Sequence, residues 1–494
     1  MNIKTGRSMR LASLVLGVAM SAAAGEGRAE TPLSDELVAA AERTLERAAT
    51  YFRESVAVEG SYVWRVSSDL ASRSGEAHTD AKQGWVQPPG TPAVGLAFAA
   101  AFEATGHPYY WGAALGAGLA LADTQLLSGG WYPMIEFDPQ RRKAWCYRRD
   151  MTKCDAKGPR HDNRDRDGTF LDDDITQSAL RLLIALDVLG DHRHPVISDA
   201  AAYGLDQLLE AQYPNGAWPV RLDRRVHDTE ILAKPGDKAR YPETWSKTYV
   251  KLEEPEFFAL NDHLMSNAIR TLLLAHRSYG DGRFLEAATR AGDFLLVAQM
   301  PDPQPGWMQT YSSAMEPIWA RKFEPPSLTS WETASTIDVL IDLHRYTGLE
   351  RYWDATHAAV AWLERVQIGD DLWARFYELE TDEPLYMTSD YTLTYQPDDL
   401  PKHYGFQDDF DIPRTLAAYY RAVGDGGDRS SPNPTSPAEI ERIVEALDEE
   451  GRWLDDDWIE SATFVENVET LSRALAAASG RRIKVGRLTA PFGN

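Results

Sequence analysis

A repeated helical hairpin constrains the fold of this chain more than any other feature of its sequence. Each repeat holds a helix that ends at a glycine, a second helix that ends near a glutamine, and a short loop that leads to a tryptophan. The markers are Gln125 and Trp131, Gln212 and Trp218, Gln299 and Trp307, and Gln367 and Trp373. Such a hairpin cannot bury its apolar face alone, so the repeats are predicted to stack on one another.

Apolar residues inside the repeats recur with the helical period, as at Leu180, Leu183 and Ile184. Glycines at 106, 190, 280 and 348 are placed where helix C-caps are expected. Further helices are expected near 34–55, 409–424, 437–449 and 459–479, and strand signals are sparse. We therefore predict an all-α fold, an α/α toroid in one domain over residues 31–494, with an open α-solenoid as the alternative.

The first residues have the composition of an export signal. Lys4, Arg7 and Arg10 precede a short apolar run that ends in small residues suited to cleavage. The run is too short to span a bilayer, and no later segment has the length and apolar character of a membrane helix. Residues 1–29 are interpreted as a signal peptide. We expect a mature protein that is secreted or periplasmic, has no membrane partner and is a monomer.

The only two cysteines, Cys146 and Cys154, lie close together in the sequence. An oxidising compartment permits a disulfide between them, and two free thiols are the alternative. Zinc sites need a larger group of ligands than these two residues provide.

The net charge of −24 excludes nucleic acid as a natural partner, because proteins that bind it carry a basic excess. An acidic chain that binds an acidic sugar needs a metal ion or basic residues gathered in one place. The alternative is that the charge only keeps an exported protein soluble.

The direction of the helices predicts one functional rim. In a ring of hairpins all inner helices run the same way, so each tryptophan loop lies beside the start of the next inner helix. Those starts are polar: Asp172-Asp173-Asp174, Asn261-Asp262-His263, Ser330-Trp331-Glu332 and Gln407-Asp408-Asp409. Calcium prefers several hard oxygen ligands, so this rim is predicted to hold a sugar site with a cation. Helix capping by the carboxylates and core packing by the tryptophans are the alternatives.

Several motifs resemble the pectate lyases of polysaccharide lyase family ten. They are PAVGLAFAAAFEATG with SGGW, then LDDDITQSALRLL, AQYPNGAWP, ALNDHLMSNA, WARKFEPPSLTSWETAS and LWARFYELETDEPLY. The resemblance covers about residues 88–410 and leaves a helical extension at 411–494. It implies an α/α toroid that cleaves polygalacturonate, or a related acidic uronate polymer, by calcium-assisted β-elimination.

The resemblance also implies roles for single residues. Asp262 matches a calcium-binding aspartate of the family, and Arg375 matches the arginine that takes the C5 proton. Asp173 and Asp174 are predicted as further ligands near Asp262. The predicted substrate-binding residues are Arg321, Lys251 and the loop tryptophans Trp131, Trp218, Trp307 and Trp373.

Two positions depart from the family pattern. His263 stands where the family has a second aspartate, and Ser312 stands where it has another calcium carboxylate. His263 is a candidate general base if the site has diverged. Two other functions therefore remain as alternatives. One is a glycoside hydrolase that uses Asp262 with Asp173 or Glu332. The other is a glycan-binding relative without catalysis, which Ser312 favours.

Overall fold

The fold is that of a computed structural model, which describes residues 33–151, 167–222, 236–251, 257–424 and 436–485. The predicted signal peptide at 1–29 lies outside the described residues. Of the predicted disulfide pair, Cys146 is buried and disulfide-bonded, and Cys154 lies outside them. No helix in the described ranges has the length and apolar character to cross a membrane.

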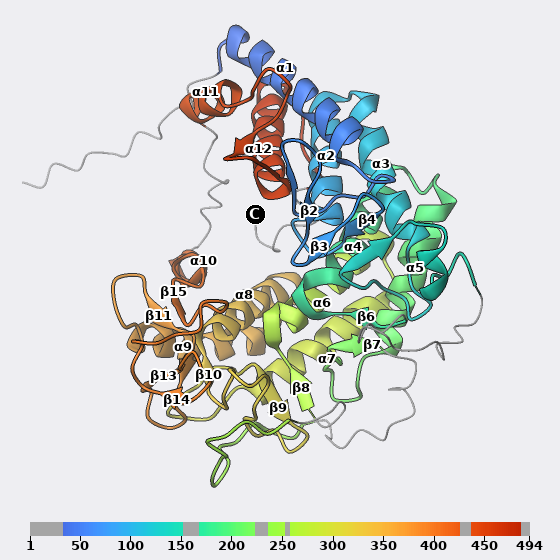
Figure 1. Cartoon of the computed structure of the whole chain (residues 1–494). Helices are drawn as coiled ribbons and strands as arrows, with labels where there is room; N and C mark the ends of the chain where they lie inside the picture. Colours follow the sequence, from blue (N-terminus) through green and yellow to red (C-terminus); the bar gives the residue numbers. More distant parts are fainter. Residues whose placement is uncertain (1–32, 152–166, 223–235, 252–256, 425–435, 486–494) are drawn as a thin grey trace, which may run out of the picture.

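Inner helices follow one another round an incomplete ring (Figure 1). Each packs beside the next in the order α12, α2, α4, α6, α8 and α10. Their bounds are Ser461–Ser479 for α12, Thr91–Thr105 for α2, Ile175–Leu189 for α4, Leu264–Tyr279 for α6, Ser330–Thr347 for α8 and Ile412–Gly424 for α10. The predicted α/α toroid is confirmed.

Outer helices cover this row. They pair in sequence with their inner partners, as α3 (Pro108–Asp123), α5 (Pro195–Glu210), α7 (Gly282–Ala298) and α9 (Glu350–Arg365). The two ends of the chain meet at α12, which is covered by α1 (Asp35–Tyr51, extended by the π-helix Phe52–Val56) and α11 (Pro437–Glu445). The last repeat is therefore assembled from both ends of the chain.

The tryptophan of each repeat is a buried structural residue that contacts the end of an outer helix. Its indole N–H donates to a carbonyl near the end of the preceding outer helix, which satisfies one of the acceptors that a helix C-terminus leaves unpaired. The pairs are Trp131 with Leu121 (2.9 Å), Trp218 with Leu208 (2.8 Å), Trp307 with Leu295 (2.8 Å), Trp373 with Leu363 (2.8 Å) and, in an additional repeat, Trp453 with Ile443 (3.0 Å).

In three of the four marker repeats, the glutamine before the loop joins neighbouring repeats, whereas Gln367 in the fourth is exposed. The Gln125 amide donates to Gly129 O of its own loop and to Ala200 O of the next outer helix, both at 2.9 Å. Gln212 and Gln299 make the same two bonds in their repeats. Since the next outer helix accepts one bond of each pair, the glutamines set the spacing of the outer layer.

These contacts correct the prediction that the loop tryptophans bind sugar. Trp131, Trp218, Trp307 and Trp373 lie on the expected rim, but they are at most 1 % exposed. An indole enclosed on all sides cannot stack on a sugar ring, so these four residues belong to the core.

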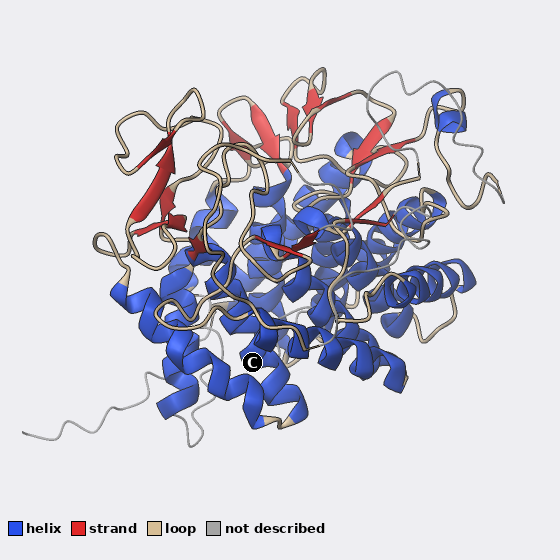
Figure 2. Ribbon diagram, turned by 90° about the horizontal axis from the view of Figure 1, so that it is seen from below, coloured by secondary structure: helices blue, strands red, loops and turns tan. Residues whose placement is uncertain are grey.

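Short strands gather at one end of the ring of helices (Figure 2). The strand before an inner helix pairs with the strand after its outer partner, so each hairpin is closed at its base. These pairs are β4 (Gln83–Trp85) with β5 (Met134–Glu136), β6 (Thr169–Phe170) with β7 (Arg221–Leu222), and β8 (Phe257–Ala259) with β9 (Thr310–Ser312). Likewise β10 (Leu328–Thr329) pairs with β12 (Phe376–Tyr377), which continues to β13 (Pro384–Met387) and β14 (Leu393–Thr394).

The remaining strands lie near the two ends of the row of inner helices. β11 (Trp373–Ala374) pairs with β15 (Gln407–Asp408) before α10. The largest sheet has the order β16 (Leu454–Asp455), β17 (Trp458–Glu460), β1 (Arg65–Ser67), β2 (Arg73–Ser74) and β3 (His78–Thr79). It pairs the strand before α12 with the strand after α1, as within the other hairpins. Strands of two to four residues carry almost no periodic pattern, which is why the sequence indicated few of them.

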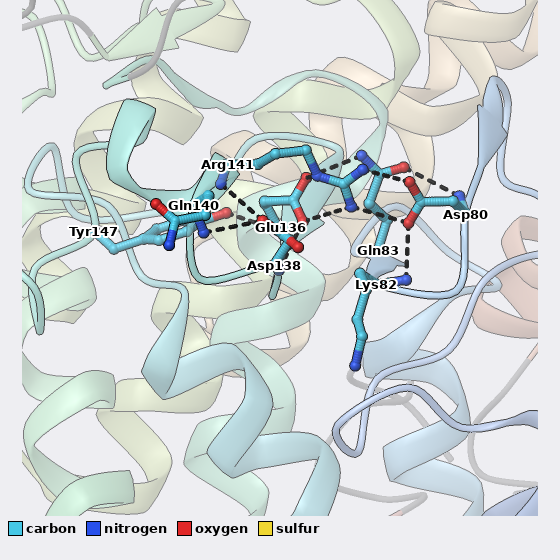
Figure 3. A network of polar contacts seen from close by, with 8 residues as sticks. All are labelled: Asp80, Lys82, Gln83, Glu136, Asp138, Gln140, Arg141 and Tyr147. Atoms are coloured by element: carbon cyan, nitrogen blue, oxygen red, sulfur yellow. Dashed lines mark hydrogen bonds and ion pairs between the residues drawn. The ribbon is translucent and has the colours of Figure 1, made fainter.

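A polar network reinforces the pair β4–β5 (Figure 3). Glu136 is buried on β5 and accepts from Gln83 of β4 at 3.0 Å. Arg141 bridges Glu136 to Asp80, with contacts of 2.9 Å and 2.6 Å. Asp80, Glu136 and Arg141 pair with one another, so we interpret the network as structural.

We predict that Trp218→Ala lowers the free energy of unfolding by about 3–5 kcal/mol, because it removes a large buried side chain and a buried hydrogen bond. Trp458→Ala, at a half-buried position on β17, is the control and is expected to cost about 1 kcal/mol. Chemical denaturation followed by circular dichroism measures both. Equal losses for the two variants would contradict the role of Trp218.

Candidate cation and substrate site

Two adjacent inner helices begin with the same distorted turn. The single 3₁₀ turns Asp172–Asp174 and Asn261–His263 precede α4 and α6 and pack against each other. The second and third residues of both turns have left-handed backbones, with φ of 52° at Asp173 and 48° at Asp262. Aspartate adopts this region more readily than most residues do, which explains its presence here.

The paired turns bring three carboxylates together. Asp172, Asp173 and Asp262 each offer one oxygen, and these oxygens lie within 4.8 Å of one another. The Asn261 amide donates to Asp262 and, at 3.4 Å, to Asp172. Gln309 donates to Asn261 Oδ1 at 2.8 Å, which orients that amide. Three hard oxygen ligands at this spacing fit a divalent cation such as calcium.

Electrostatics favour a cation at the same place. Burial raises the pKa of Asp173 to about 7, and the nearby charge of Asp262 adds to this rise. Burial and the charge of Asp262 also raise the pKa of Asp172, and burial raises that of Asp262 itself. Mutual repulsion opposes three ionised carboxylates at such distances, and a bound cation relieves it.

Arg321 borders the carboxylates. Its Nη2 lies 3.9 Å from Asp262 Oδ2, and its Nε donates to Glu324 at 2.6 Å. Glu324 is buried and also accepts from the hydroxyl of Tyr404 at 2.7 Å. Nearly half of the Arg321 side chain remains exposed. The structure thus holds a partly exposed guanidinium beside the carboxylates, where it can pair with an anionic ligand.

Arg375 lies in an aromatic cage between β11 and β12. Its guanidinium carbon is 4.4 Å from the ring centre of Trp331, 4.5 Å from that of Tyr404 and 4.9 Å from that of Phe410. Its Nε donates to Gly405 O at 2.7 Å. Its Nη1 is buried and has no hydrogen-bond partner among the described residues. The cage fixes the guanidinium and leaves one nitrogen without a partner in the protein.

Glu332 is a second buried charge near Arg375. It lies in the first turn of α8, where Ser330 N donates to Arg375 O at 3.1 Å. Glu332 is 2 % exposed, and neither of its carboxyl oxygens has a hydrogen-bond partner in the described part of the chain. Burial raises its pKa to about 7, against the opposing charge of Arg375. An unsatisfied buried carboxyl is costly, and such groups concentrate at functional sites.

His263 does not replace the missing aspartate. Its ring meets that of Trp331 edge to face, with centres 4.5 Å apart. Burial lowers its pKa to about 3, with Arg270 and Arg375 lowering it further. The imidazole is therefore neutral at physiological pH and a weak proton acceptor, which disfavours a role as general base.

Two further predicted residues pair with groups outside the carboxylate cluster, and a third is exposed. Asp174 accepts instead from Arg181 on α4, so the prediction of Asp174 as a ligand is replaced by Asp172. The Ser312 hydroxyl accepts from the backbone N–H groups of Ala314 and Glu316 in its own turn. Lys251 is exposed on the loop that leads to β8.

Sequence reasoning missed Asp172 because three consecutive aspartates offer no sign of which two point toward α6. A signal was present in the repeat, since Asp172 and Asn261 occupy the first position of equivalent turns. The aromatic cage was also missed. Its members come from two segments far apart in the chain, since Trp331 lies on α8 and Tyr404 and Phe410 flank β15.

Comparison with known proteins supports one family. Residues 125–227 match the pectic acid lyase family, which confirms the predicted resemblance over that segment. The segment includes Asp172 and Asp173 and ends before Asp262 and Arg375. No curated protein matches the chain in sequence.

Several solved structures are similar in fold. One is a variant of a family 10 polysaccharide lyase from Cellvibrio cellulosa in complex with trigalacturonic acid, with 16% identity and a TM-score of 0.45 over 68% of this chain and 99% of that one. Another is a family 76 α-mannanase of Bacteroides thetaiotaomicron, with 10% identity and a TM-score of 0.43 over 90% and 96% of the two chains. A D-mannose isomerase has 11% identity and a TM-score of 0.47 over 90% and 98%.

We predict that Asp262→Asn and Asp172→Asn each weaken calcium binding about tenfold or more, because each removes a charged ligand. Isothermal titration with calcium chloride measures the affinity. Asp174→Asn is the matched control, an adjacent aspartate that pairs with Arg181, and its calcium affinity should equal that of the wild type. Wild-type affinity in Asp262→Asn would contradict the assignment.

Proposed function

We propose that this chain is an exported polysaccharide lyase that cleaves polygalacturonate, or a related uronate polymer, by calcium-assisted β-elimination. The observation that carries the proposal is the arrangement of two arginines beside a cluster of carboxylates in a chain of net charge −24. The match of residues 125–227 to the pectic acid lyase family supports the same reaction. Export rests on the composition of residues 1–29, and the monomer stays a prediction.

The chemistry needs a base at C5 of a uronate and relief of the negative charge that then develops on its carboxylate. The C5 proton leaves to the base, its bonding electrons form the C4–C5 double bond, and the C4–O bond breaks. The leaving oxygen keeps the electron pair of that bond and takes up a proton from water. Calcium held by Asp172, Asp173 and Asp262 would withdraw charge from the carboxylate. Arg321 would pair with the same carboxylate and orient it.

Arg375 is the residue that we assign to the C5 proton. The three rings of the cage and Gly405 O hold its guanidinium in one place. Arginine acts as a base only when it has lost its proton. The rigid placement of the guanidinium is the contribution of the fold, because catalysis by proton transfer depends first on geometry.

We predict that Arg375→Ala lowers turnover of de-esterified pectin by about 100-fold or more, since it removes the proton acceptor. The assay follows the absorbance of the unsaturated uronide product, with added calcium and then with chelator. Arg345→Ala, in the last turn of α8, is the control and should keep wild-type turnover. If Arg375→Ala retains near wild-type turnover with unchanged helical content, Arg375 is not the base.

One observation favours a glycoside hydrolase as the second candidate. Glu332 is buried with a pKa of about 7, which suits a general acid, and Asp173 or Asp262 would be the second carboxylate. An acid must hold its proton to act, so this activity would be present below about pH 7 and fall as the pH rises through that value.

The product separates the two candidates. A hydrolase releases new reducing ends without the absorbance of an unsaturated uronide, and we expect the lyase product instead. New reducing ends without unsaturation, lost in Glu332→Gln, would replace the lyase proposal with the hydrolase.

A further inference from the structure

A second group of unusual side chains lies on the loop 236–251, outside the segment that matches the family. Loop 236–251 contains no helix or strand and is anchored to the segment that follows β9. Arg240 N donates to Met315 O at 3.1 Å, and the Arg240 side chain pairs with Glu316 at 2.8 Å. Trp319 donates from its indole to Ser246 O at 2.8 Å. Because Trp319 precedes Arg321 by two residues, this loop is held next to the candidate site.

Aromatic side chains meet at this junction. The ring of Trp319 is buried, and the rings of Trp245 and Tyr249 contact it edge to face, with centres 6.3 Å and 5.9 Å away. Tyr249 is 39% exposed. The Lys247 ammonium lies 3.5 Å from the ring centre of Trp245. A buried indole thus supports an exposed phenol ring and a lysine.

The loop that follows β14 completes the group. Lys247 pairs with Glu378 at 2.9 Å, and the hydroxyl of Tyr395 donates to the same carboxylate at 2.7 Å. Half of the Lys247 side chain remains exposed, and Tyr395 is also exposed. We call Trp245, Lys247, Tyr249 and Tyr395 the loop patch.

Exposed apolar side chains are concentrated here. The large hydrophobic residues that the described part of the chain exposes are Leu119, Val196, Tyr249, Val250, Tyr395, Tyr420, Val423 and Leu454. Three of them, Tyr249, Val250 and Tyr395, lie on the loop patch or beside it. Apolar groups that gather on a soluble surface mark a binding site more often than scattered ones do.

We propose that the loop patch is a separate subsite for a uronate unit of the same polymer, beyond the unit that Arg321 and Arg375 bind. Aromatic rings offer apolar faces to the C–H side of a sugar, and the Lys247 ammonium offers donors to its carboxylate. Charge favours this occupant, because Lys247 stays half exposed beside Glu378 and its ammonium can donate to an anionic ligand. Continuity selects it too, since Trp319 links the loop patch to Arg321.

This inference takes its substrate class from the proposed function, but it concerns binding and not turnover. A polymer that occupies the loop patch gains contacts that a short oligouronate at Arg375 does not reach. The loop patch should therefore govern affinity for long chains and leave the rate of the chemical step unchanged.

The test is affinity electrophoresis of the full chain in native gels that contain polygalacturonate, with a neutral glucan as the reference polymer. We expect wild-type protein to be retarded by polygalacturonate only, and Tyr249→Ala and Lys247→Met to bind it about fivefold more weakly. Tyr420→Ala is the matched control for Tyr249→Ala, since Tyr420 is an exposed tyrosine on α10, outside the loop patch. Thermal unfolding verifies that each variant is folded.

Kinetics provide the second measurement. In an active enzyme both loop-patch variants should raise KM for the polymer about fivefold, with kcat and the turnover of a short oligouronate unchanged. Unaltered retardation of both variants, or a wild type that polygalacturonate does not retard, overturns the inference. If polygalacturonate retards the wild type and the variants weaken this, but no turnover is seen, the proposed function is wrong and the subsite remains supported. If the enzyme turns over polygalacturonate and both variants behave as the wild type, the subsite is wrong and the proposed function remains supported.

Discussion

The ring depends on a buried hydrogen bond repeated at every hairpin, from a tryptophan indole to a carbonyl at the end of the preceding outer helix. A helix that ends in the core leaves carbonyls without partners, and each unpaired group is costly. The indole satisfies one of them and fills the space between layers with a single large ring. In three repeats a glutamine amide then joins the loop to the next outer helix. The hydrogen bonds of one repeat therefore position its neighbour.

That regularity places the chemistry. Because successive inner helices start at the same rim, the distorted turns before α4 and α6 come into contact and their carboxylates converge. Burial, and then repulsion within the cluster, raise the pKa values of Asp172 and Asp173. The ring therefore supports an arrangement of carboxylates that is unfavourable by itself and that a divalent cation could stabilise.

Arg375 and Glu332, which carry opposite charges, are also held by the fold in positions that are unfavourable for isolated groups. The inner start of α8 carries Glu332 into the core, and the strand pair β10–β12 brings Arg375 beside it. Both keep polar atoms without partners in the described protein, a cost that a purely structural pair would avoid by direct hydrogen bonding. The loop patch, in contrast, depends on the loop 236–251, which lies outside the repeats.

The sequence by itself determined the stack of helical hairpins, because the spacing of the Gln and Trp markers and the helical period are local properties that any stacking must preserve. Only the tertiary structure decided between a toroid and an open solenoid. The sequence also indicated Asp173, Asp262, Arg321 and Arg375 as candidates, since residue type and motif order are visible along the chain. Tertiary structure alone decided that the loop tryptophans are enclosed and that Asp172 joins the cluster while Asp174 pairs with Arg181. It also decided that rings from two distant segments surround Arg375. Burial and side-chain direction depend on neighbours that are far away in sequence. In the left-handed turn before α4, Asp173 joins the carboxylate cluster and the next residue, Asp174, pairs with Arg181 instead.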